Sequence, residues 1–340
     1  MLIANEEQLK YMVGGLLYAP AVHKTIVRNI DAGVYGEITA VAFCLEDTIR
    51  DAALPMAEEA LRETLLEAAK IPEERRPFIF VRIRTPEHMQ HMHTYLGEAG
   101  QILTGFILPK FDLSNCEEYV ALVKKINRNQ GRKIYVMPIL ESRMIAEIGS
   151  RVRTLTVLKK VIDSMREYVL NVRVGGNDFC NLYGLRRSVR QTIYDIGVVR
   201  DILVDILNVF SVDYIVSGPV WEYFGNDPDG DWAKGLRREL ELDRLNGFVG
   251  KTVIHPSQIP LVAESLKVSR SDFEDAEHIL HWEDNTLGVA KSADGSRMSE
   301  VNCLGRWADR VSALGRIYGI REVLNERIQC GRCPHTCKEI

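Results

Sequence analysis

The sequence lacks any apolar run near the ~20 residues that a membrane-spanning helix needs. It also lacks long blocks of like charge: 43 Lys and Arg against 47 Asp and Glu give a formal net charge of -4. These absences exclude a membrane span and argue against a nucleic-acid or membrane-surface protein. The start, MLIANEEQLK, lacks the basic and apolar regions of a signal peptide, so we expect a cytoplasmic protein.

Cysteine is sparse until the last residues of the chain. Four cysteines are scattered among apolar or mixed neighbours and are typical of reduced thiols: Cys44, Cys116, Cys180 and Cys303. The others are Cys330, Cys333 and Cys337, close to His335. This tail holds only one half of a metal site, so we favour a frayed terminus, with a metal bridge between subunits as the alternative.

Eight short apolar runs recur between residues 15 and 256, each followed by a segment with apolar residues at helical spacing. Because the runs do not alternate apolar and polar residues, they are typical of strands buried on both faces of a parallel sheet. The predicted strands are residues 15–20, 40–47, 78–84, 105–110, 134–142, 170–178, 213–219 and 250–256.

Eight strand–helix units of this size predict an α/β fold, a (β/α)₈ TIM barrel, as the catalytic domain over residues 1–260. A doubly wound open sheet is the alternative, but the first helix lacks the G-x-G-x-x-G opening of that fold. Residues 261–328 carry helical patterns and predict a C-terminal helical extension, and residues 329–340 form the cysteine-rich tail.

Polar residues lie at the carboxyl ends of several predicted strands, where the chemistry of a βα barrel is placed. They are Glu46, Asp47, Arg82, Arg84, Lys110, Glu141, Asp178 and His255. Glu141 and Asp178 end neighbouring strands and suit Mg²⁺, which takes one or two protein carboxylates with water and substrate oxygens. Glu46 and Asp47 are then placed to hold metal-bound waters. The alternative is that these acids cap helices or pair with the basic residues.

Two further features of the predicted rim concern substrate binding. Arg82 is suited to hold a carboxylate and the oxygen of a developing enolate, a role compatible with an ion pair to a neighbouring acid. In VGGNDF, the acid at Asp178 would repel a phosphate, so we interpret Gly175 and Gly176 as giving Asp178 access to a metal. Gly176 and Asn177, which is predicted to turn the chain, join Arg82 as substrate-binding candidates.

Weaker patterns leave alternatives open. His88, His91 and His93 follow the third strand, but a third zinc ligand at matching spacing is missing, so we favour a solvated helix start. Arg186, Arg187 and Arg190 either meet an anionic substrate group or face solvent. For His255, before Pro256, we favour hydrogen bonding within the last turn over a catalytic role.

The rim motifs together resemble the citrate lyase β-subunit family of the HpcH/HpaI aldolase superfamily over roughly residues 14 to 260. CLEDTIRDA is similar to its Leu-Glu-Asp strand end, FVRIR to its Val-Arg segment and PILES to its glutamate strand. VGGNDFCNLYG resembles its Gly-x-x-Asp motif, and GKTVIHPSQI its closing Ile-His-Pro-Ser-Gln, which is the most specific of the five.

The resemblance implies a Mg²⁺-binding TIM barrel that makes or breaks a carbon–carbon bond next to a carbonyl. Glu141 and Asp178 match the metal ligands, Arg82 the enolate-binding arginine, and Glu46 and Asp47 the acidic pair near the metal. Such an enzyme would take a small oxo-acid or hydroxy-acid derivative, with a CoA or carrier thioester as a further substrate. The family implies a trimer or hexamer whose C-terminal helices reach a neighbouring subunit.

Two departures bear on thioester use. Gly14 and Gly15 stand where thioester-using members carry Arg-Ser, with Ala21 at their following glycine. Ser299 and Glu300 stand where many members carry the Met-Ile-Asp acid, for which Glu300 is a substitute candidate. In these respects the sequence resembles a divergent branch of citrate-lyase-like C–C bond lyases linked to tellurium-resistance and stress gene clusters. The alternatives are a phosphoenolpyruvate-type Mg²⁺ enzyme and a non-catalytic metabolite-binding or scaffold barrel.

Overall fold

The computed structural model describes residues 6–23, 25–128, 131–283, 286–292, 295 and 297–321. It divides the chain into two compact units, Met1–Leu266 and Lys267–Ile340. The cysteine-rich tail, residues 329–340, lies outside the described residues. No helix in the described ranges is both long and apolar enough to span a membrane.

The first unit is built around eight parallel strands, and the first seven are paired in the order of the chain. They are β1 (Gly15–Pro20), β2 (Ala40–Cys44), β3 (Phe78–Arg82), β4 (Gly105–Leu108), β5 (Tyr135–Leu140), β6 (Val172–Val174), β7 (Val216–Ser217) and β8 (Lys251–Val253). β8 returns to pair with β1, and a single bridge between Gly218 and Lys251 joins β7 to β8. The predicted TIM barrel is confirmed.

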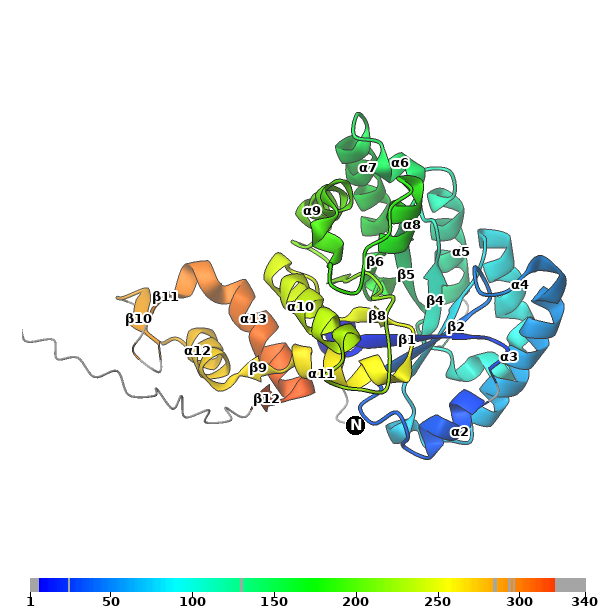
Figure 1. The fold of residues 1–340 in the computed structure, drawn as a ribbon, viewed down its shortest axis with the longest axis horizontal. Coiled ribbons are helices and arrows are strands. Elements are labelled where there is room, and N and C mark those ends of the chain that lie inside the picture. The colour runs from blue at the N-terminus through cyan, green and yellow to red at the C-terminus, as the bar shows by residue number, and fades with distance from the viewer. Residues whose placement is uncertain are drawn as a thin grey trace, which may run out of the picture. The chain divides into compact units, whose positions relative to one another are not determined.

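Helices lie around the outside of these strands (Figure 1). They are α2 (Thr25–Asp31), α3 (Leu54–Ala68), α4 (Pro86–Leu96), α5 (Cys116–Arg128), α6 (Arg143–Ala146), α7 (Arg151–Asp163), α8 (Gly176–Leu182), α9 (Gly197–Phe210), α10 (Asp231–Asn246) and α11 (Ile259–Leu266), and a further helix, α1 (Glu6–Met12), precedes β1. Because they cover the outer face, the strands are apolar on both faces, as the unbroken runs predict.

Apolar side chains fill the amino-terminal half of the barrel interior. This cluster includes Leu16, Ala42, Phe80, Ile107 and Met137, all buried and each from a different strand. An eight-stranded barrel is just wide enough for side chains to fill it, so this half is a packed core. The polar residues of the interior lie toward the carboxyl ends.

The second unit has a small core of its own. Its elements are β9 (Val268–Ser269), α12 (Arg270–Leu280), β10 (Val289–Lys291), β11 (Met298–Glu300), α13 (Val301–Tyr318) and β12 (Ile320–Arg321). Ala276 and Ile279 on α12 pack against Ala308 and Val311 on α13. In the described residues this unit has the helices α12 and α13 and an antiparallel β10–β11 hairpin.

Candidate active site

The rim arginine and three acids meet at the carboxyl ends of the strands. Arg82, the last residue of β3, places Nη2 2.8 Å from Oε2 of Glu46 and 3.2 Å from Oδ2 of Asp47. The same nitrogen lies 3.4 Å from Oε1 of Glu141, which follows β5. Parallel strands bring these ends to one edge, and the structure therefore assembles four of the predicted residues into one cluster.

Lys110 joins this cluster through both its backbone and its side chain. Its backbone N–H donates to Oε1 of Glu141 at 2.9 Å, and Nζ pairs with Glu46 and lies 3.4 Å from Asp47. Its φ of 48° makes it the sole non-glycine residue with positive φ in the described chain. That left-handed conformation is costly for lysine, and such strain concentrates at functional sites.

Gly175 lies between the two predicted metal-ligating carboxylates. A Cβ added to Gly175 would collide with the side chain of Glu141 and would lie 2.8 Å from Oδ2 of Asp178. A Cβ on Gly176 would lie 2.7 Å from Cβ of Pro219. Glycine is therefore required at both positions, because each backbone passes too close to a neighbour for any side chain.

Burial and charge shift the protonation of the cluster. Burial raises the pKa of Glu141 to about 8, and the negative charge of Asp178 adds to the rise. Burial likewise raises the pKa of Glu46. Burial alone would lower the pKa of Arg82, but the charges of Glu141 and Glu46 outweigh it and raise that pKa. The cluster gathers negative charge in a poorly solvated place, an arrangement that a cation would relieve.

Glu141 and Asp178 are the residues that could hold a metal ion. Their carboxylates face the same glycine, and both are hard oxygen donors. In the described ranges no three His, Cys, Asp or Glu side chains are grouped so as to hold a metal by themselves. The donor set therefore fits an ion satisfied by two protein carboxylates with water and substrate completing its shell, as Mg²⁺ is.

Asn177 and the remaining sequence candidates have different surroundings. Asn177 lies half-buried in the first turn of α8, and its side chain makes no hydrogen bond to another described residue. His255 stacks on Phe224 with ring centroids 4.3 Å apart, and its Nδ1 lies 2.9 Å from Oγ of Ser257. His255 thus has contacts that order the turn after β8.

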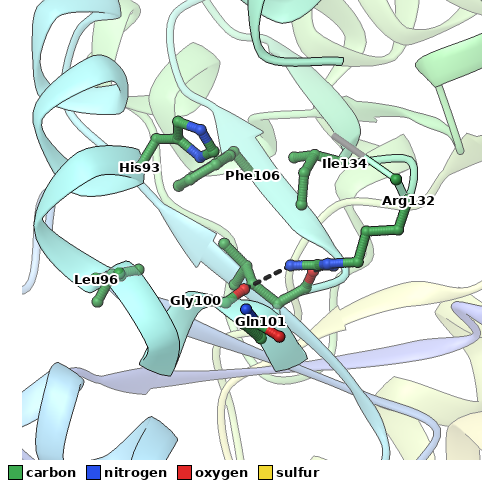
Figure 2. A pocket seen from close by; sticks show the side chains of 10 residues that line it. His93, Leu96, Gly100, Gln101, Phe106, Arg132 and Ile134 are labelled. Atoms are coloured by element: carbon green, nitrogen blue, oxygen red, sulfur yellow. Dashed lines mark hydrogen bonds between the residues drawn. The ribbon is translucent and has the colours of Figure 1, made fainter. Parts of the chain in front are cut away.

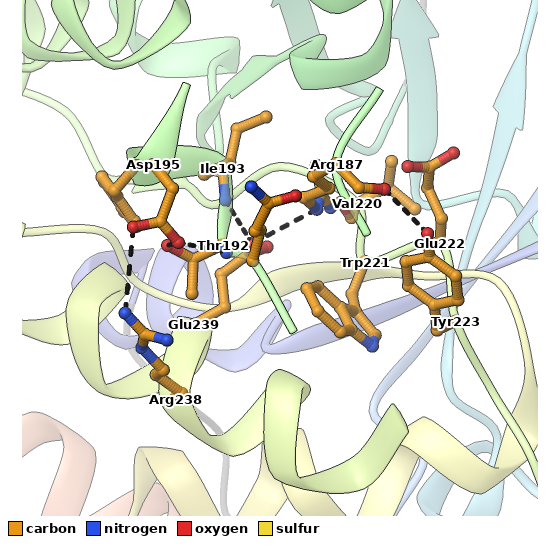
Figure 3. A network of polar contacts seen from close by, with 12 residues as sticks. Arg187, Thr192, Ile193, Asp195, Val220, Trp221, Glu222, Tyr223, Arg238 and Glu239 are labelled. Atoms are coloured by element: carbon orange, nitrogen blue, oxygen red, sulfur yellow. Dashed lines mark hydrogen bonds and ion pairs between the residues drawn. The ribbon is translucent and has the colours of Figure 1, made fainter. Parts of the chain in front are cut away.

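The three arginines after β6 differ from one another. Arg187 is buried, with Nε 3.5 Å from Oε2 of Glu239 and an Nη2 that donates to the carbonyl of Val220 (Figure 3). Glu239 also pairs with Nζ of buried Lys251 at 2.9 Å. Arg186 and Arg190 are exposed and pair with Glu222 and Asp231 at 3.2 and 3.5 Å. Arg187 belongs to a buried ion-pair network and the other two to the surface.

Two of the three histidines after β3 converge on one carboxylate. Nε2 of His88 and of His91 lie 3.0 and 3.1 Å from the two oxygens of Glu58 on α3. Nδ1 of His88 accepts the backbone N–H of Arg84 at 3.1 Å. The carboxylate occupies the ring nitrogens that a zinc ion would need, so these residues tie α4 to α3.

Arg84 is a positioning residue that sequence reasoning left without a role. Its Nε donates to the carbonyl of Leu45 at 2.7 Å, and its Nη atoms contact Ile49 and Asp51. These residues flank Glu46 and Asp47, so one side chain fixes the loop that carries both acids. The sequence did indicate a role for Arg84 near the site, because it stands two residues after Arg82, at the end of a predicted strand.

Two cavities lie at the other end of the barrel. One, of about 510 Å³, is lined by residues around the starts of β4 and β5, among them His93, Gln101 and Arg132 (Figure 2). The second, of about 650 Å³, shares Gln101 and Arg132 with it. In Figure 2 Arg132 reaches the carbonyl of Gly100, at 2.6 Å. These cavities are separate from the rim cluster.

Several solved structures share the fold. The CitE protein of Mycobacterium tuberculosis, crystallised with magnesium, acetoacetate and coenzyme A, aligns with a TM-score of 0.58 and 21% identity, covering 91% of this chain and 99% of that chain. A citrate lyase of Burkholderia xenovorans LB400 gives a TM-score of 0.67 with 15% identity, covering 91% and 93%. Haloferax volcanii malate synthase gives 0.57 with 13% identity, covering 89% and 87%.

A comparison with curated protein sequences gives no match. The pattern of a family described as C–C bond lyase of the TIM-barrel fold matches residues 7–320. That range includes all eight barrel strands and, in the second unit, the elements from β9 to α13. The resemblance to citrate-lyase-type carbon–carbon lyases is therefore confirmed, and the chain belongs to the C–C bond lyase family of the TIM-barrel fold.

Proposed function

We propose that this protein is a Mg²⁺-dependent carbon–carbon bond lyase acting on a 2-oxo acid, or on a hydroxy-acid derivative, through an enolate. One observation carries the proposal: two carboxylates, Glu141 and Asp178, face a common glycine within reach of Arg82. The CitE protein of M. tuberculosis, which shares the fold, was crystallised with magnesium, acetoacetate and coenzyme A, and this supports the choice of metal and of ligand class.

Glu141 and Asp178 would hold the Mg²⁺, with Gly175 keeping the space between them open. When bound, the ion would supply a Lewis acid for the carboxylate and neighbouring carbonyl oxygen of the substrate. Glu46 and Asp47 would accept hydrogen bonds from waters around the ion, since both carboxylates lie at the same rim.

Arg82 would stabilise the negative charge that develops when the carbon–carbon bond breaks. Its guanidinium is fixed by three acidic side chains and stays protonated, because its raised pKa keeps the charge at any working pH. A donor fixed before the reaction needs no reorganisation as charge develops on the enolate oxygen. Lys110 would keep Glu46 and Asp47 in position through its ammonium group.

Calorimetric titration tests this proposal. Pyruvate, glyoxylate and oxaloacetate should bind only when Mg²⁺ is present, and Glu141→Gln should remove the Mg²⁺-dependent binding of each. Glu147→Gln, an exposed glutamate on the neighbouring loop, is the matched control and should bind as the unaltered protein does.

The other outcomes separate the rival functions. Mg²⁺-dependent binding of phosphoenolpyruvate, with weak binding of the oxo acids, would favour a phosphoenolpyruvate-type enzyme. Binding of neither metal nor oxo acid would leave a non-catalytic barrel. Turnover of an identified substrate at an unchanged rate by Glu141→Gln would refute the metal site. Addition of acetyl-CoA with each oxo acid tests thioester use.

A further inference from the structure

A second arginine lies inside the barrel, below the rim cluster. Arg173 on β6 is 1% exposed, and its Nη2 donates to Oγ1 of Thr252 at 2.7 Å. Thr252 is on β8, and β7 stands between these strands. The contact is therefore made across the interior, so the Arg173 side chain lies in the lumen.

Within the described residues, no carboxylate pairs with Arg173. It has a side-chain hydrogen bond with Tyr18 and a long contact, 3.5 Å from Nη1 to the side-chain oxygen of its near neighbour Asn171, but neither partner is a carboxylate. Burial lowers the pKa of Arg173, and the positive charge of Arg82 lowers it further, while Tyr18 acts in the opposite direction. A buried cation without a counter-ion is costly, because it loses its hydration without gaining an ion pair.

Three donors in this part of the barrel have no hydrogen-bond partner. They are Nε of Arg82, Nε of Arg173 and Nδ2 of Asn171, each on a buried residue. Buried polar groups in folded proteins are nearly always satisfied, so a group of unsatisfied donors calls for an acceptor. Two guanidinium groups and an amide together call for an anion.

The position of Arg173 along the barrel axis places these unpartnered donors next to the proposed substrate site. Arg173 is in register with Ile139, which stands two residues before Glu141 on β5. Two residues of strand span about 7 Å. Arg173 thus starts one layer below the acids, and Arg82 lies over the ring of Tyr18, 5.9 Å from Cζ to the centroid, in the same lumen.

We propose that Arg173, with the unpartnered Nε of Arg82 and the Asn171 amide, forms an anion subsite that takes a second carboxylate of the substrate. The proposal rests on the function proposed above and specifies that the oxo acid carries an acidic group at its other end. The lumen of an eight-stranded barrel is narrow, and a carboxylate at the other end of a small oxo acid is the smaller and less charged of the anionic groups that a guanidinium binds.

Matched ligand pairs test this subsite. With Mg²⁺ present, we expect oxaloacetate to bind at least 10-fold more tightly than 2-oxobutanoate, or 2-oxoglutarate at least 10-fold more tightly than 2-oxopentanoate. Within each pair the ligands differ in the terminal carboxylate. In the pair that shows this preference, Arg173→Met should reduce the ratio of the two affinities to below 3-fold. The affinities for 2-oxobutanoate and 2-oxopentanoate should stay unchanged. Arg128→Met, an exposed arginine on α5, is the control and should keep the full ratio.

Arg173→Lys guards against loss of the fold, because it keeps a buried cation and lacks Nε. It should show a ratio between those of the unaltered protein and Arg173→Met. A preference that survives both substitutions, or is absent from the unaltered protein while pyruvate still binds with Mg²⁺, overturns the subsite. Binding of inorganic phosphate in the absence of any oxo acid, lost in Arg173→Met, also overturns the subsite, because Arg173 would then bind a free anion and not a carboxylate of the substrate. If no oxo acid binds with Mg²⁺, the proposed function itself fails.

Discussion

At the scale of single residues, two backbone positions determine the geometry of the rim cluster. Gly175 leaves room between Glu141 and Asp178, and Lys110 adopts a left-handed conformation that aims its N–H at Glu141. Neither residue needs to contact a ligand in order to affect its binding. Both act by fixing where the carboxylates stand.

Gly175→Ala should weaken Mg²⁺ binding by at least 10-fold. The new methyl group would collide with Glu141 and approach Asp178, so the two carboxylates must move apart or rotate. Calorimetry measures the affinity. Gly197→Ala is the matched control, since its methyl group would meet no atom nearer than 3.9 Å. Equal Mg²⁺ affinity in both variants would show that Gly175 does not shape a metal site.

Mg²⁺ binding should release close to one proton at pH 7. Because the pKa of Glu141 is raised to about 8, the metal-free carboxyl is mostly protonated at neutral pH, and a ligating carboxylate must lose that proton. Affinity should therefore rise as the pH increases from 6 to 8 and level off above that. Titrations in buffers of different ionisation enthalpy count the protons. A pH-independent affinity would contradict the assignment of Glu141.

At the scale of elements, the loop after β2 is held by the strand beside it. Arg84, just after β3, contacts three residues of this loop, and its own backbone is held by His88 at the start of α4. His88 is in turn fixed by Glu58 on α3. The acids Glu46 and Asp47 are therefore positioned by two neighbouring helices as well as by their own strand.

Arg84→Met should lower turnover by about 10- to 100-fold, because small displacements of groups at a reacting centre have effects of that size. Arg84→Lys should not restore activity, since an ammonium group cannot span three acceptors that a guanidinium fork reaches. Steady-state kinetics on an identified substrate provides the measurement, with Arg75→Met as an exposed arginine control. Full activity in Arg84→Lys would mean that charge alone is needed there.

The elements and the rim were predictable, and the contacts between distant elements were not. Unbroken apolar runs predict buried parallel strands, and the strand-end rule then brings Arg82, Glu46 and Glu141 together. The conformation of Lys110 could not be predicted, because a lysine gives no signal for positive φ. Arg173 stands in the strand LNVRV without a neighbour that reveals what it meets across the lumen. Asn177 was counted with the substrate-binding residues, and that role stays a prediction.

At the scale of the whole molecule, the chain has a barrel unit and a second unit with its own helical core. We propose that the protein is a homo-oligomer, as the family resemblance implies. The mass in solution, measured by light scattering, should then be that of three or six chains of 38.6 kDa each. A monomer at micromolar concentration would contradict this.

Glu300, at the end of β11, is exposed and accepts from Sγ of Cys303 at 3.3 Å. If it serves a neighbouring subunit as a proton-transfer group, Glu300→Gln should lower turnover at least 10-fold and leave Mg²⁺-dependent pyruvate binding unchanged. Glu283→Gln, an exposed glutamate in the same unit, is the control. Unchanged turnover would place the acid or base of the reaction within the barrel.

The join between β7 and β8 affects where the barrel opens locally. Here the ring is closed by one bridge and a few hydrogen bonds, such as the 3.0 Å bond from Gly218 N–H to the carbonyl of Gly250. A join with so few bonds opens locally at a lower free energy than the rest of the barrel. Its amides should exchange with solvent before those of β2 and β3, and each opening gives water a lateral route toward Thr252 and Arg173.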